Sequence, residues 1–141
     1  MRLIEPGAES VKPLAMLIKD SRKLKDLQQE FNDKFPYLKI EFYKGEHEAG
    51  KPTSVGKQLE PGKTVGQVRK VHTEGELSID GHQEVATLEN HFWEQFGLNV
   101  QVFRLSGNLW LQTSTTDQWT LAEQNRKGEH SEQAYREMHG E

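Results

Sequence analysis

The sequence predicts an α+β fold, a two-layer sandwich of tandem strand–helix–strand units that is ferredoxin-like or related. Three observations predict it. Segments 14–43 and 75–103 of the 141-residue chain share one spacing of apolar residues. Each segment begins and ends with apolar residues that alternate with others, which is typical of strands. Between these runs, apolar residues recur every three or four positions, as on the buried face of a helix.

The apolar residues of the two segments coincide when Leu27 is set on Leu88, 61 residues further along the chain. The other matched pairs, the last three after the loss of one residue, are Met16 with Leu77, Ile18 with Ile79, Leu24 with Val85, Phe31 with Phe92, Phe35 with Phe96, Leu38 with Leu98, Ile40 with Val100 and Phe42 with Val102. This agreement predicts an internal repeat, which informs on architecture rather than on activity.

Local signals indicate where the two helices start and stop. In the first unit, Asp20 or Ser21 is expected to cap the helix. Pro36 ends it, because proline has no N–H and restricts the residue before it. In the second unit, Asp80-Gly81 opens the helix and Gly97 ends it as a C-terminal cap.

Further elements flank the two units. The turn Ser106-Gly107-Asn108 predicts a hairpin with a return strand at 109–113, because Gly and Asn accept positive φ angles. Segment 65–71 predicts an extra strand, which with the hairpin strand would extend the sheet. Thr120-Leu121-Ala122-Glu123 matches a capping box and predicts a short helix that Gly128 ends.

Length and composition predict a single domain over 14–128, with an N-terminal extension at 1–13 and a polar tail at 129–141. The Gly-, Lys- and Pro-rich segment 44–64 is expected to be a loop insert. Without cysteine, the chain has neither disulfides nor thiolate metal sites. No apolar run approaches the roughly 20 residues that span a bilayer. We therefore expect a soluble, cytoplasmic protein that does not act at a membrane.

Charge is distributed unevenly along the chain. Residues 1–72 carry 14 basic and 10 acidic side chains, whereas residues 73–141 carry 4 and 12, for an overall charge of −4. The two halves therefore differ in sign. Solvated faces of this kind are common, and a head-to-tail or dimer contact is the alternative interpretation.

Residues 96–128, FGLNVQVFRLSGNLWLQTSTTDQWTLAEQNRKG, resemble a family of small uncharacterised bacterial proteins. The shared segments are FGL-x-V-Q-V-F-R-x-S-G-x-x-W-L-x-T and T-D-x-W-T-L-x-x-Q-N. The resemblance implies no particular activity. It marks the following positions for inspection: Trp110, Thr113, Asp117, Trp119, Gln124 and Asn125.

Catalytic and metal-binding patterns have little support. Pro61-Gly62-Lys63-Thr64 resembles the end of a phosphate loop, but Lys57 stands where the motif needs its first glycine. The six histidines match no metal-ligand spacing, and no nucleophile elbow is present. Paired carboxylates such as Glu84 and Glu89 are interpreted as solubilising charges opposite the apolar stripe. The sequence therefore favours a non-enzymatic protein without cofactor or metal.

Three functions remain open from the sequence. The first is a protein-interaction module whose partner is another protein or a second copy of the chain. Its contact surface would be the sheet face with Gln101, Phe103, Trp110 and Gln112. The second is a small-molecule or peptide binder, or an enzyme, that uses Trp110, Thr113, Thr115, Thr116, Asp117 and Trp119. The third is nucleic-acid contact through the basic segment 44–72, with Lys57, Lys63, Arg69 and Lys70 on phosphates.

Overall fold

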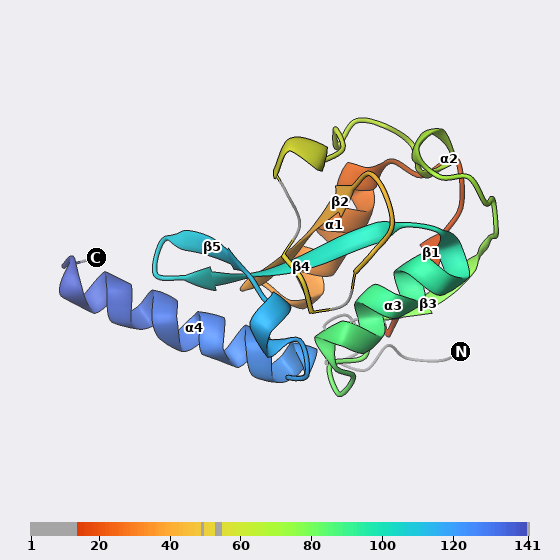
Figure 1. The fold of residues 1–141 in the computed structure, drawn as a ribbon. Helices are drawn as coiled ribbons and strands as arrows, with labels where there is room; N and C mark the ends of the chain where they lie inside the picture. The colour runs from red at the N-terminus through yellow and green to blue at the C-terminus, as the bar shows by residue number, and fades with distance from the viewer. Residues whose placement is uncertain (1–13, 49, 53–54, 141) are drawn as a thin grey trace, which may run out of the picture.

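The computed structural model describes residues 14–48, 50–52 and 55–140 (Figure 1). The elements are β1 (Ala15–Ile18), α1 (Leu24–Lys34), β2 (Leu38–Tyr43), the 3-10 helix η2 (Val55–Lys57), α2 (Val65–Val68), β3 (Gly75–Ser78), α3 (Val85–Phe96), β4 (Asn99–Ser106), β5 (Leu109–Gln112), the 3-10 helix η3 (Ser114–Thr116) and α4 (Leu121–Met138). The α+β class, the two strand–helix–strand units and the C-terminal helix are those that the sequence predicts. The predicted extension at 1–13 lies outside the described residues.

The described strands form two sheets, where the sequence predicts one. β1 pairs antiparallel with β3, and β2, β4 and β5 form a second antiparallel sheet with β4 in the middle. Each sheet therefore joins a strand of the first unit to a strand of the second. The two units build one body because neither has a sheet of its own.

The pairing places matched positions of the two units opposite each other. Met16 of β1 faces Leu77 of β3, its partner in the sequence alignment. In the second sheet Glu41 of β2 faces Gln101 of β4, which the alignment also matches. Both strand pairs therefore bring corresponding positions of the two units together.

The core lies between the helices and the sheets. The helical stripes predicted from the sequence are buried, with Leu24, Leu27 and Phe31 on α1 and Val85, Leu88 and Phe92 on α3. The Phe92 ring meets Phe42 of β2 edge-on, with centroids 5.9 Å apart. Figure 1 shows α1 behind β2 and β4, and α4 running alongside the β4–β5 hairpin.

The two helices begin without the local side-chain caps that the sequence predicts. No side chain at 20–21 caps α1; instead, Leu24 N donates to Lys63 O at 2.9 Å. In the same way, Val85 N at the start of α3 donates to Trp119 O at 3.0 Å. Carbonyls from distant segments thus take the free N–H groups of both helices.

The predicted roles of two glycines, as a helix cap and in a hairpin turn, are confirmed. Gly97 ends α3 in the left-handed conformation, with φ 65°. Gly107 has φ 62° in the hairpin turn that leads into β5. Both positions need a residue that adopts positive φ without a steric cost.

The strand predicted at 65–71 is wrong, because this segment begins with the short helix α2. Thr64 caps it: its hydroxyl accepts from Gln67 N, and the Gln67 side chain accepts from Thr64 N. This reciprocal pair is a capping box, and it starts a helical turn. Within that turn Val65 is buried in the core.

The predicted end of the last helix at Gly128 is also wrong. α4 starts at the predicted Thr120–Glu123 capping box but continues to Met138, through the segment 129–141 expected to be a tail. Gly128 is buried, and a Cβ there would lie 2.8 Å from Tyr37 Cβ. The glycine therefore lets the helix pass close to the body of the protein instead of ending it.

Candidate functional site

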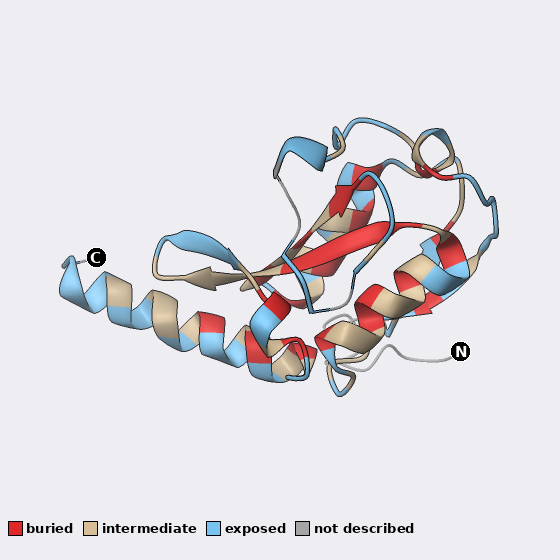
Figure 2. Ribbon diagram, viewed as in Figure 1, coloured by how far each residue is buried: buried red, intermediate tan, exposed pale blue. Residues whose placement is uncertain are grey.

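The β4–β5 hairpin carries the most exposed apolar strand of the structure's described part. The residues of β5 are LWLQ, which includes no charged side chain. Leu109, Trp110 and Leu111 are 64%, 36% and 44% exposed. Figure 2 shows the contrast along the hairpin: the first half of β4 is buried, whereas β5 is exposed.

The two tryptophans of the predicted ligand pocket lie on opposite faces of the sheet. Trp110 pairs with Leu105, and the Lys39 ammonium lies 5.0 Å from its ring centroid. Trp119 is approached instead by the Arg104 guanidinium, at 5.8 Å. Successive residues of a strand point to opposite faces of the sheet. Leu105, on the face of Trp110, and Arg104, beside Trp119, are such neighbours, so the two indole rings lie on opposite faces. The structure does not bring them together as walls of one cavity.

The polar residues between the tryptophans hold the chain in place. Thr113 is buried, and its hydroxyl donates to Val102 O at 2.9 Å. Asp117 is buried as well, and its carbonyl accepts from Ala86 N at the start of α3. Thr115 is exposed. These contacts are structural, as expected of a polar segment that leads into a helix.

Two further positions marked by the resemblance attach α4 to the body. Gln124 is fully buried, and its amide donates to the carbonyl and the hydroxyl of Thr116 at 2.8 Å each. Its Oε1 accepts from Arg104. Asn125 Oδ1 accepts from Tyr37 N at 2.9 Å. Both side chains therefore fix the position of the helix.

The four residues of the predicted basic patch do not share one environment. Lys57, Lys63 and Lys70 are exposed, but the side chain of Arg69 is fully buried. Arg69 Nε donates to Asp20 Oδ1 at 3.0 Å, and its Nη1 donates to Phe96 O at 3.1 Å. The guanidinium thus ties α2 to both strand–helix–strand units, and only the three lysines reach the surface.

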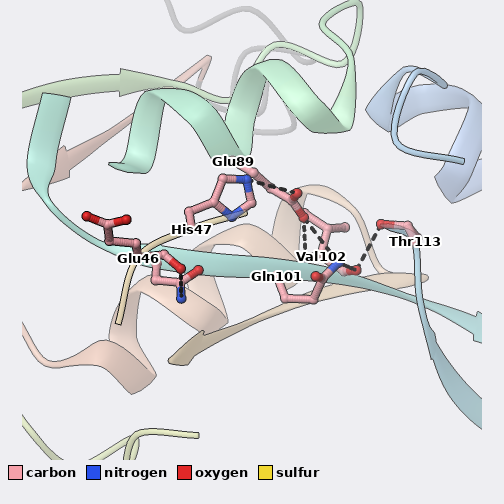
Figure 3. Close-up of polar contacts among 7 residues, drawn as sticks. Glu46, His47, Glu89, Gln101, Val102 and Thr113 are labelled. Carbon is pink, nitrogen blue, oxygen red and sulfur yellow. Dashed lines mark hydrogen bonds and ion pairs between the residues drawn. The ribbon is translucent and has the colours of Figure 1, made fainter. Parts of the chain in front are cut away.

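A buried polar cluster lies between α3 and β4, where the sequence predicts none. Glu89 of α3 is 2% exposed; its Oε2 accepts from Val102 N at 2.9 Å and from Gln101 Nε2 at 3.2 Å. In Figure 3 the His47 imidazole points toward the same carboxylate from the segment after β2. His47 Nε2 lies 3.7 Å from Glu89 Oε1. The interpretation of Glu89 as a solubilising charge is therefore wrong.

Burial favours the neutral forms of both members of this pair. Desolvation raises the pKa of Glu89 to about 8, and the charge of Asp117 adds to it, although the hydrogen bond from Val102 N acts in the opposite direction. Desolvation also lowers the pKa of His47, against the hydrogen bond to Asn99 and the charge of Asp117. Both shifts act toward an uncharged pair. With both side chains shielded from solvent, the pair has no direct access to a substrate.

A signal for Glu89 was present in the sequence. It follows Val85 by four positions and precedes Phe92 by three, so it falls within the apolar stripe of the helix. A carboxylate at such a position is buried with its helix face. His47 had no comparable signal, because its burial depends on how the segment after β2 folds back over β4.

The described residues include no group of three His, Asp or Glu side chains placed to hold a metal ion. Among the helices they form, none has the length and apolar character to cross a bilayer. The chain matches no protein-family model, no curated protein and no solved structure.

Proposed function

We propose that this protein is a non-enzymatic interaction module that associates with a second copy of itself through the free edge of β5. The single observation that carries the proposal is the edge itself. β5 pairs with β4 on one side, and no other described strand lies on its other side. Exposed strand edges are templates for further pairing.

The direction of one hydrogen bond shows which backbone groups of β5 face outward. Leu105 N donates to Tyr37 O at 3.0 Å, on the side of β4 away from β5. The opposed residues Leu105 and Trp110 are therefore not a hydrogen-bonded pair, and the backbone N–H and C=O of Trp110 point to the free edge. The backbone N–H and C=O of Trp110 could therefore form hydrogen bonds with a second strand.

The sequence of the edge supports pairing rather than protection. Proteins usually protect an edge strand with lysine, proline or a covering segment. The far edge of β2 is covered in this way: Phe42 O accepts from Leu59 N, and Ile40 O accepts from Gln28 Nε2. β5 instead exposes leucine and tryptophan without a charge.

A second copy is the partner that fits this edge most simply. Antiparallel pairing of β5 with its own copy satisfies both edges at once, as a twofold interface requires. Each copy also brings the apolar surface that the other exposes. The strand is short, so the contact area is small and we expect a weak, concentration-dependent dimer.

Sedimentation velocity over a series of concentrations tests this proposal. The parent is expected to shift from monomer to dimer as concentration rises, whereas Trp110→Lys stays monomeric because it places a charge on the edge. Met138→Lys is the matched control: Met138 is 82% exposed at the far end of α4, so this variant should dimerise like the parent. Melting temperatures of all three proteins check that folding is unchanged. A parent that stays monomeric throughout, or a Trp110→Lys variant that dimerises normally, contradicts the proposal.

The two other functions have weaker support. Nucleic-acid contact loses a cation because the Arg69 guanidinium is buried and paired with Asp20. A ligand site between Trp110 and Trp119 is not supported, because the two rings lie on opposite faces of the sheet and cannot enclose one ligand. The cavity beside Trp119 is a hollow of about 220 Å³ formed mainly by α4 side chains.

A further inference from the structure

A larger cavity lies far from the β5 edge, and we propose that it binds a small, uncharged, mostly apolar molecule that carries one hydrogen-bond acceptor. The cavity has a volume of about 500 Å³, within the range of roughly 300–1,000 Å³ typical of ligand sites. It is formed by the end of β2, the start of β4, the segment 68–71 and the C-terminal end of α3. None of its residues belongs to the ligand pocket that the sequence predicts between Trp110 and Trp119.

Most of the cavity lining is apolar. Phe42 and Leu98 belong to the buried core, and Leu59 and Val68 pack against it. Trp93 of α3 is half-buried in the lining. An apolar ligand body would contact carbon on several sides, which is the usual character of small-molecule sites.

The Tyr43 hydroxyl is among the buried polar atoms of the lining that lack a hydrogen-bond partner. Tyr43 is 2% exposed, and its hydroxyl makes no hydrogen bond to any described residue. Buried hydroxyl groups nearly always have a partner, so an unpartnered one beside a cavity indicates a missing acceptor. Burial raises the pKa of Tyr43 to about 12, with a further contribution from the charge of Glu41. The phenol therefore keeps its proton and acts as a hydrogen-bond donor.

The charges of the lining favour an uncharged ligand. Two exposed lysines, Lys44 and Lys70, are balanced by two exposed carboxylates, Glu46 and Glu94. The remaining cation, Arg69, is already paired with Asp20. Neither a strongly anionic nor a strongly cationic molecule meets an excess of opposite charge here.

Titration with two probes of similar shape tests the proposal. Acetophenone carries a carbonyl acceptor, and ethylbenzene lacks it. Binding is followed by NMR through the indole N–H of Trp93, while Trp110 and Trp119 serve as internal controls because they do not line the cavity. We expect both probes to shift the Trp93 signal selectively, and acetophenone to bind about fivefold more tightly through one hydrogen bond.

The variant Tyr43→Phe removes only the hydroxyl. It should bind ethylbenzene as the parent does and lose the preference for acetophenone. Three results would overturn the proposal: no shift of Trp93 with either probe, equal shifts of all three indoles, or an unchanged preference in Tyr43→Phe. The first two are read on the parent alone, so the test does not depend on the variant's folding.

Discussion

Glu89 Oε1 lies 3.7 Å from His47 Nε2, and the two side chains are 2% and 5% exposed. The carboxylate also accepts the N–H of Val102, at the part of β4 that β5 does not reach. A buried side chain thus takes the place of a strand partner at this edge. Burial favours the uncharged forms of both groups, because a buried charge without a partner is costly.

The free energy of unfolding should therefore fall as pH rises through the range where Glu89 ionises. The pKa of the carboxyl is near its ordinary value of 4.5 in the unfolded chain and about 8 in the folded protein. Between these values the folded state binds the extra proton, so stability falls with rising pH, by at most about 5 kcal/mol in total. Urea unfolding of the parent and of Glu89→Gln between about pH 5 and pH 8 measures this. The variant cannot ionise and should show a much flatter profile.

His47 acts in the opposite direction at lower pH. Its lowered pKa means that stability is lost as pH falls below the unfolded value of 6.5. Comparison of the parent with Glu89→Gln isolates the carboxyl, because both proteins retain the histidine. Parallel pH profiles for the two proteins would show that Glu89 is already ionised in the fold.

Matched phenylalanines in the two helices should contribute alike to stability. Phe31 and Phe92 are both fully buried, so truncation of either to alanine should cost about 3–5 kcal/mol. Chemical denaturation measures both values. Phe103→Ala is the control, because this ring is only half-buried beside Lys39 and its loss should cost less. Equal stability of all three variants would contradict the described core.

Replacement of Gly128 by alanine separates helix propensity from packing. Alanine is the better helix former by about 1 kcal/mol, so propensity alone predicts stabilisation. The new Cβ would lie 2.8 Å from Tyr37 Cβ and 3.1 Å from Tyr37 O. We therefore expect a net destabilisation of about 1–3 kcal/mol. Gln133→Ala, at an exposed position of the same helix, should be neutral or slightly stabilising in the same thermal melt. If Gly128→Ala stabilised the protein as Gln133→Ala does, α4 would not pack closely against Tyr37, which would contradict the structure.

Arg69 and Lys63 should respond differently to loss of charge. Arg69→Gln removes hydrogen bonds to Asp20 and to Phe96 O and should cost about 2 kcal/mol of stability. Lys63 is exposed, so Lys63→Gln should stay within about 0.5 kcal/mol of the parent. Denaturant midpoints compare the two. Equal effects would place the Arg69 side chain at the surface with the lysines.

Periodicity predicted the two units well because their apolar stripes face one core. The predicted strand at 65–71 is wrong even though Val65, Val68 and Val71 recur at intervals of three residues, which fits a helix better than a strand. The capping box of Thr64 and Gln67 was visible in the sequence and favoured a helix. The wrong helix end predicted at Gly128 has another cause. A glycine is typical both of a helix end and of a close approach between segments, and only the folded position of Tyr37 shows which of the two applies.

The helix starts could not be predicted from local sequence. Leu24 and Val85 donate to Lys63 O and Trp119 O, which lie 39 and 34 residues further along the chain. Backbone carbonyls have no residue signature, so nothing in the chain marks them as caps. The same limit applies to the cavity beside Tyr43, because its walls come from four separate segments.

Hydrogen exchange of the Trp110 backbone amide tests the β5 interface most directly. In the monomer this N–H lies on the side of β5 that pairs with no described strand, whereas pairing with a second copy gives it an acceptor. The Leu111 amide is the internal reference. Leu111 lies opposite Arg104, and because hydrogen-bonded and non-hydrogen-bonded pairs alternate, its N–H points to β4 within the hairpin. Protection of the Trp110 amide is expected to rise with protein concentration, while that of the Leu111 amide stays constant. Rapid exchange of Trp110 at every concentration would contradict it.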